Sequence, residues 1–150
     1  DPLGMFVIGY ILLSVWAVDI FAMFSGKLIG GPKLAPIISP KKTWVGLFGG
    51  MVGASLAAGL SFLTVVGFGF GDMQFSAVII IAPLLAICSQ AADLFESAIK
   101  RGYNVKDSGA IIPGHGGLLD RVDGLIGVLI IALIIVVWRG GPSSAALWVW

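Results

Sequence analysis

The stretch that decides the fold, WVGLFGGMVGASLAAGLSFLTVV, runs from Trp44 to Val66 without a charged side chain. A helix needs about 20 mostly apolar residues to cross roughly 30 Å of hydrocarbon, so this stretch is long enough to span a membrane. We expect the glycines between Gly46 and Gly59 to allow close helix packing rather than to bind phosphate. Three other stretches qualify, and the expected transmembrane helices are Met5–Phe24, Trp44–Val66, Phe75–Leu94 and Leu118–Trp138.

The composition of the whole chain agrees with a membrane environment. Of the 150 residues, 58% are hydrophobic and 11% are charged, and the mean hydropathy is +1.04. Soluble domains carry about 25% charged residues, so a soluble globular domain is excluded. The net charge of +1, without a run of basic residues, gives no indication of a nucleic-acid partner. The chain opens with Asp1-Pro2, which indicates a fragment or a processed product. The sequence thus predicts an all-α, polytopic membrane protein with about four transmembrane helices.

Basic residues are distributed unequally between the two ends of the expected spans. Cytoplasmic loops carry an excess of Lys and Arg, so we expect the richer face to be cytoplasmic and both termini to lie outside. The connection 25–43 contains three prolines and cannot form one regular helix. Only Arg139 lies on the opposite face from the other eight basic residues, Lys27, Lys33, Lys41, Lys42, Lys100, Arg101, Lys106 and Arg121.

Acidic residues gather at the same face, where lipid should exclude them. Asp93 and Glu96 are three positions apart, as are Asp120 and Asp123, so each pair shares one face of its helix. Asp19 lies five residues before the end of the first expected span, about 7 Å inward. A carboxylate near lipid costs up to about 3 kcal/mol and usually faces a cavity, an ionic partner or a bound cation. Two helices with paired carboxylates at one depth therefore suit a hard divalent cation, which prefers oxygen ligands.

Two loops beside these acids look suited to phosphate. Ser39-Pro40-Lys41-Lys42-Thr43 presents hydroxyl and ammonium groups just before the second span. In Gly114-His115-Gly116-Gly117 the glycines permit a close approach of the backbone to a ligand. The fourth span begins directly afterwards, and its N-terminal amides could receive an anion. For the first loop the alternative is ordinary positive-inside flanking. For the acidic residues the alternative is boundary ion pairs, Glu96 with Lys100 and Asp120 with Arg121.

A longer pattern covers Ser97–Asp123, which reads SAIKRGYNVKDSGAIIPGHGGLLDRVD. It resembles the signature of phosphatidate cytidylyltransferases (CDP-diacylglycerol synthases), S-x-x-K-R-x4-K-D-x-G-x3-P-G-H-G-G-x-x-D-R-x-D. The blocks Ser39–Gly46 and Ser89–Ser97 also resemble that family, although Val45 and Ala92 depart from residues that many relatives carry. The resemblance covers about Ala17–Trp138. It implies that residues 1–150 form one membrane-embedded catalytic region, the C-terminal part of a longer enzyme.

The resemblance implies that CTP and phosphatidate react to give CDP-diacylglycerol and pyrophosphate in phospholipid biosynthesis. The implied cofactor is Mg²⁺, with a second cation as a further candidate. The implied metal ligands are Asp93, Asp120 and Asp123, with Asp19 and Glu96 as further candidates. The implied catalytic residues are Lys100, Arg101, Asp107, His115 and Arg121. The implied substrate-binding residues are Ser39, Lys41, Lys42, Thr43, Lys106, Gly116 and Gly117.

The implied partners are CTP, bilayer phosphatidate and membrane lipids, and a homodimer is a candidate assembly. The implied location is the bacterial inner (plasma) membrane, with the active site and its catalytic loops facing the cytoplasm. Three alternatives stay open. One is another CTP-dependent lipid enzyme, such as a polyprenol or phytol kinase, in which the nucleotide donates its γ-phosphate to an alcohol. The second is a transporter or channel that passes cations along intramembrane acids, and the third is an inactive truncated membrane fragment.

Overall fold

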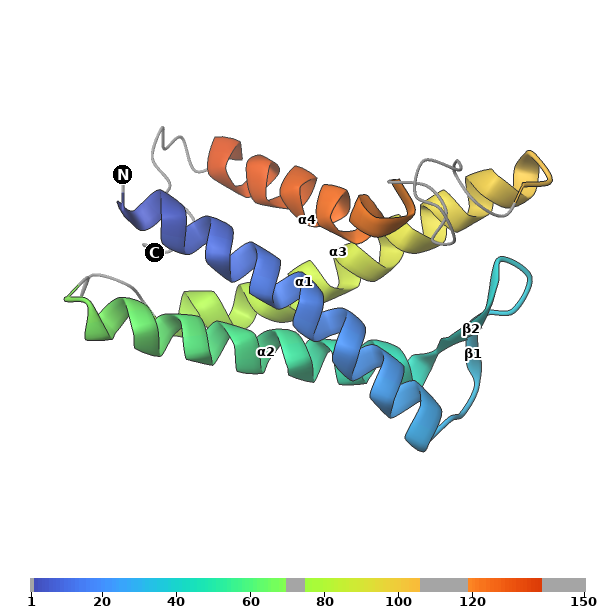
Figure 1. The fold of residues 1–150 in the computed structure, drawn as a ribbon, viewed down its shortest axis with the longest axis horizontal. Coiled ribbons are helices and arrows are strands. Elements are labelled where there is room, and N and C mark those ends of the chain that lie inside the picture. The colour runs from blue at the N-terminus through green and yellow to red at the C-terminus, as the bar shows by residue number, and fades with distance from the viewer. Residues whose placement is uncertain (1, 70–74, 106–118, 139–150) are drawn as a thin grey trace.

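The computed structural model describes residues 2–69, 75–105 and 119–138. Within these ranges the chain forms four helices and one two-stranded hairpin (Figure 1). In chain order the elements are α1 (Pro2–Leu28), β1 (Lys33–Ala35), β2 (Ser39–Thr43), α2 (Trp44–Gly67), α3 (Phe75–Gly102) and α4 (Leu119–Trp138). The predicted helical fold is confirmed, and the hairpin is an addition that the sequence analysis did not anticipate.

Three helical segments within the described residues are long and apolar enough to cross a membrane: Gly4–Leu28, Trp44–Gly67 and Val78–Gly102. The apolar part of α4, Val122–Trp138, is shorter than these three. The polytopic helical architecture and the first three expected spans are therefore confirmed, while a fourth crossing stays a prediction.

Two helices extend beyond the ends that hydropathy predicts. α1 continues from Phe24 to Leu28, and α3 continues past Leu94 to Gly102. Basic residues in the last turn of each helix interact favourably with the helix dipole, so the helices persist into the polar layer. Asp19 consequently lies nine residues, about 14 Å, from the C-terminal end of α1. The predicted depth of about 7 Å refers to the end of the apolar run at Phe24 and stays a prediction, because the helix continues four residues past that point.

Glycines of α2 let its backbone approach α1 closely. A Cβ atom at Gly53 would lie 2.7 Å from the Ala17 carbonyl oxygen, and one at Gly46 would lie 3.0 Å from the Ala22 carbonyl oxygen. Side chains larger than hydrogen would push the two helices apart at these positions. The predicted packing role is therefore confirmed here, but it fails at Gly59, where an added Cβ would have no neighbour within 4 Å.

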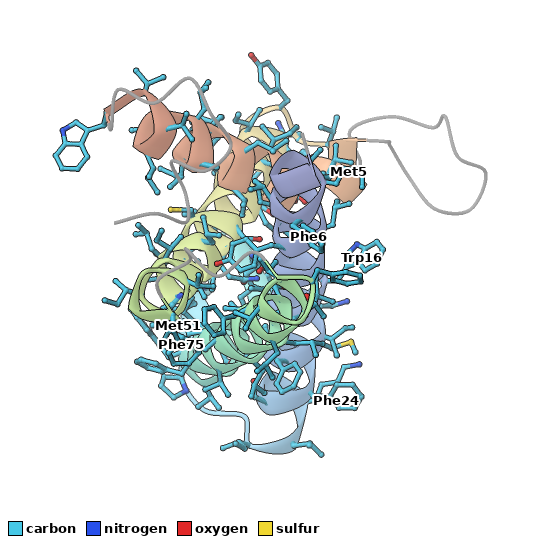
Figure 2. All side chains as sticks on the ribbon, turned by 90° about the vertical axis from the view of Figure 1, so that its left-hand side faces the viewer. Met5, Phe6, Trp16, Phe24, Met51 and Phe75 are labelled. Atoms are coloured by element: carbon cyan, nitrogen blue, oxygen red, sulfur yellow. The ribbon has the colours of Figure 1, made fainter. Side chains whose placement is uncertain are left out.

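The remaining helices pack on this pair through small residues, and the outer surface is apolar. Gly124 of α4 faces Ser89 of α3, so the backbones of these two helices also come close. Figure 2 shows Trp16 and Phe24 pointing away from the bundle, and their side chains are 63% and 55% exposed. A surface with large exposed apolar residues on every long helix suits lipid as its surroundings.

The hairpin marks the polar end of the bundle. Figure 1 shows that α1 and α3 end on the side where β1 and β2 lie, and that α2 and α4 begin there. Because successive helices run in opposite directions, the connection that follows α1 and the end of α3 lie at the same end of the bundle. The polar residues of the connection 25–43 and of the end of α3 therefore meet in space.

Substituting Gly53 tests the close contact between α1 and α2. Gly53→Ala should lower the free energy of unfolding by about 1–3 kcal/mol, because its Cβ meets the Ala17 carbonyl and the Phe21 side chain. Gly59→Ala is the matched control on the same helix and should leave stability unchanged or slightly raised. The measurement is the thermal unfolding midpoint in detergent, and equal midpoints for the two variants would contradict the packing described here.

Candidate active site at the hairpin end of the bundle

The hairpin fixes the start of α2. β1 and β2 pair antiparallel, with Lys33 opposite Thr43 and Ala35 opposite Ser39. Thr43 is the N-cap of α2, and its hydroxyl oxygen accepts a hydrogen bond from the Gly46 amide at 3.0 Å. An N-cap threonine satisfies one of the amides left unpaired at a helix start. Thr43 is only 5% exposed, so its hydroxyl has a structural duty in addition to its predicted contact with substrate.

An ion pair joins the hairpin to α3. The Lys42 Nζ atom lies 2.7 Å from Asp93 Oδ2, and it also donates to the Gln90 carbonyl oxygen at 3.3 Å. The other carboxylate oxygen, Asp93 Oδ1, accepts a hydrogen bond from Ser97 Oγ at 3.4 Å. The two charged side chains are 15% and 35% exposed, so the pair is partly withdrawn from solvent. Removing one partner of such a pair destabilises the folded protein, because the other charge is left without compensation.

A cavity of about 590 Å³ opens beside this ion pair. Elements α1, β1, β2, α2 and α3 all contribute to its wall. Its charged lining within the described chain consists of four lysines and two carboxylates, Lys27, Lys33, Lys41, Lys42, Asp19 and Asp93. The excess of ammonium groups makes the cavity suited to a polyanion such as a nucleoside triphosphate.

Asp19, in the lining of this cavity, lies within electrostatic range of other acidic side chains. Asp19 interacts electrostatically with two further carboxylates, Asp93 and Asp123, and with the Lys42 ammonium. Asp123 also accepts a hydrogen bond from the Gly124 amide at 2.7 Å through Oδ1. Among the described residues, no group of three or more Asp, Glu, His or Cys side chains is close enough to hold a metal ion unaided. The Lys42 ammonium, paired with Asp93, also acts electrostatically on Asp19.

A second, smaller cavity of about 200 Å³ is lined by residues of β2 and of the C-terminal end of α3. Its polar lining consists of two hydroxyls and three cations, Ser39, Ser97, Lys41, Lys100 and Arg101. The Lys100 ammonium lies 3.4 Å from Glu96 Oε1, one helical turn away. This pair is the boundary ion pair that the sequence offered as the alternative to a metal site at Glu96.

The structure brings most of the described candidate residues together. Lys41, Lys42, Thr43, Asp19 and Asp93 line the larger cavity, and Ser39, Lys41, Lys100 and Arg101 line the smaller one. Lys106, Asp107, His115, Gly116 and Gly117 lie outside the described residues, as do the side chains of Asp120 and Arg121. The roles of all these residues stay predictions.

Several lining residues were not predicted as site residues. Gln90, Lys27 and Lys33 line the larger cavity, and Ser97 lines the smaller one. Gln90 precedes Asp93 by three positions and therefore shares its helix face, a spacing that could have revealed it. Lys27 and Lys33 looked like ordinary positive-inside flanking, and only the folded hairpin turns them toward a cavity.

Fold and site together define a polytopic helical membrane protein with a lysine-lined cavity at one end of its bundle. The chain belongs to the cytidylyltransferase family, whose pattern matches residues 1–138. It is 51% identical over 130 residues to the phosphatidate cytidylyltransferase of Rickettsia bellii, covering 84% of this chain and 55% of that relative. It is 48% identical over 128 residues to the phosphatidate cytidylyltransferase of Brucella abortus, covering 84% of this chain and 45% of that relative. The chain thus spans about half the length of the curated relatives it matches.

Proposed function

We propose that this chain carries the catalytic region of an enzyme that transfers a cytidylyl group from CTP to phosphatidate, giving CDP-diacylglycerol and pyrophosphate. The observation that carries the proposal is the lysine-lined cavity of about 590 Å³ at one end of a membrane bundle. CTP is a polyanion that arrives from water, and phosphatidate is an anion that stays in the bilayer. A cationic cavity at the membrane boundary is where both can be bound together. The family membership and the names of the relatives support this choice of substrates.

The reaction needs charge neutralisation more than it needs a general base. A phosphate oxygen of phosphatidate attacks the α-phosphorus of CTP, and the bond from that phosphorus to the bridging oxygen of the β-phosphate breaks. Pyrophosphate leaves with the electron pair of that bond. The attacking phosphomonoester is already an anion at neutral pH, so no side chain has to remove a proton from it. Lys27, Lys33 and Lys41 would offset the repulsion between the two anions and stabilise the departing charge.

The acidic residues have the donor chemistry that Mg²⁺ prefers, namely carboxylate oxygens. Mg²⁺ is commonly held by one or two carboxylates together with substrate phosphates and water, so a complete protein cage is not required. We propose Asp93 and Asp123 as protein ligands, with Asp120 as a third and with Asp19 and Glu96 as further candidates. When bound, the ion would neutralise phosphate charge and stabilise the leaving pyrophosphate. A second cation stays a prediction.

We further propose that the hairpin end faces the cytoplasm of a bacterium, at its inner membrane. In the sequence, eight of the nine basic residues fall in or beside the two connections expected at this face, and the bias of Lys and Arg toward cytoplasmic loops supports the orientation. The relatives come from bacteria, which supports the location. CTP would then reach the cavity directly from the compartment that supplies nucleotides. A homodimer stays a prediction.

Labelled nucleotide tests the proposed reaction directly. The full-length protein, in bilayers containing phosphatidate, should transfer label from α-labelled CTP to the lipid and release the label of γ-labelled CTP as pyrophosphate. The reason is that the bond broken lies between the α- and β-phosphates. Label passing from the γ-position to a lipid alcohol would instead identify a lipid kinase, and no transfer from either position would contradict the proposal.

Asp123→Asn tests the proposed metal ligand. The substitution keeps the Oδ1 acceptor for the Gly124 amide but removes the carboxylate charge, so the protein should insert and purify normally. Turnover should fall by about 100-fold or more, as expected when a group that stabilises charge in the transition state is lost. The assay is CDP-diacylglycerol formation at several Mg²⁺ concentrations, with Asp72→Asn as the control. Near-normal turnover with unchanged Mg²⁺ dependence would show that Asp123 is not a ligand.

A further inference from the structure

The two cavities beside β2 differ in charge. The smaller one has three cations and two hydroxyls, and none of its described lining residues is a carboxylate. One of these cations, Lys100, is paired with Glu96, so the charge that distinguishes this cavity rests mainly on Lys41 and Arg101. The larger one mixes lysines with Asp19 and Asp93. A phosphate group without a bound cation is repelled by carboxylates, so it is better accommodated in the smaller cavity. Arg101 suits such a group, because the planar guanidinium binds phosphate through two parallel hydrogen bonds.

The two cavities also differ in size. Pockets for ligands of the size of a nucleotide enclose roughly 300–1,000 Å³. The larger cavity, at about 590 Å³, falls within that range. The smaller one, at about 200 Å³, falls below it. The smaller cavity therefore has room for one phosphate group and its immediate linkage, and a nucleoside triphosphate requires the larger one.

Position along α3 separates the two cavities as well. Asp93, which lines the larger cavity, precedes Lys100, which lines the smaller one, by about 10 Å along the helix axis. Lys100 and Arg101 belong to the last turn of α3, so the smaller cavity lies nearer to the end of this helix.

The two cavities share two lining residues. Lys41 and Pro40 of β2 line the larger and the smaller cavity alike. Anions bound in the two cavities would therefore be neighbours, with Lys41 beside both. This is the arrangement that a transfer between two phosphorylated substrates requires.

We propose that the smaller cavity binds the phosphomonoester headgroup of the lipid substrate, while the larger cavity binds the nucleotide. The inference rests on the proposed function, to which it adds a separate subsite for each substrate. Arg101 and Ser97 belong to the lipid subsite alone, Lys33 belongs to the nucleotide subsite alone, and Lys41 serves both.

Three matched substitutions test this division in the full-length protein, reconstituted in bilayers of phosphatidylcholine with a varied fraction of phosphatidate. Arg101→Gln should raise the phosphatidate fraction needed for half-maximal rate by about tenfold, the effect of losing one charge-assisted contact. It should change the KM for CTP by less than about twofold. Lys33→Gln should raise the KM for CTP and leave the half-maximal phosphatidate fraction nearly unchanged. Lys41→Gln should raise both values. Arg101 is exposed, so its replacement is not expected to disturb folding.

A binding measurement makes the test independent of turnover. Binding of a short-chain phosphatidate to the detergent-solubilised protein, without CTP, should weaken about tenfold in Arg101→Gln and stay unchanged in Lys33→Gln. Inorganic phosphate, added as a competitor, distinguishes a site for any free phosphate from one that needs the lipid: a lipid subsite is displaced only weakly. Strong displacement at concentrations similar to those of the lipid would overturn the assignment to a lipid headgroup.

The two proposals fail in different ways. If the wild-type protein forms no CDP-diacylglycerol, the proposed function fails, whereas the binding results still decide the lipid subsite. If the wild-type protein is active but Arg101→Gln raises the KM for CTP, or raises both values equally, the proposed function stands. In that case the division into two subsites is wrong.

Discussion

The ion pair between Lys42 and Asp93 joins the hairpin to α3 inside the boundary of the membrane, and the site depends on it. Asp93 lies nine residues before the end of α3. Its carboxylate must be paired or solvated, because an unpaired charge on a membrane helix is costly. Lys42 supplies the pairing from a strand that lies directly before α2. The position of β2 is thereby tied to α3, and residues of β2 in turn line both cavities.

The close contact between α1 and α2 supports this arrangement from the other side. Gly46 and Gly53 bring the backbone of α2 against α1, and Thr43 caps α2 at the level where the hairpin ends. Small residues at a helix interface allow polar groups to converge without a gap that lipid would fill. Asp19 of α1 is consequently held within electrostatic range of Asp93 and Lys42. The glycines that allow α1 and α2 to pack closely therefore also help to place the charged side chains of the site.

The sequence predicted the helices better than it predicted their ends or their contacts. The start of α2 at Trp44 was predicted from hydropathy alone, and its predicted end at Val66 differs by one residue from Gly67. The hairpin escaped prediction because its strands have only three and five residues, and β2 is polar and contains Pro40. Lys42 and Asp93 were both predicted as site residues, but their pairing joins positions 51 residues apart, and spacing within one helix cannot reveal such a contact. The motif around His115, which carries the family resemblance most strongly, lies outside the described residues.

A double-mutant cycle on Lys42 and Asp93 tests most directly whether this pair organises the site. The free energy of unfolding would be measured, without nucleotide or metal, for Lys42→Met, Asp93→Asn and the double variant. The ion pair predicts a coupling energy of at least about 1 kcal/mol, because each single change leaves the other charge without its partner. The neighbouring and exposed Lys41, replaced by Met in the same cycle with Asp93→Asn, should show additive effects. Additive effects for Lys42 and Asp93 as well would contradict the account.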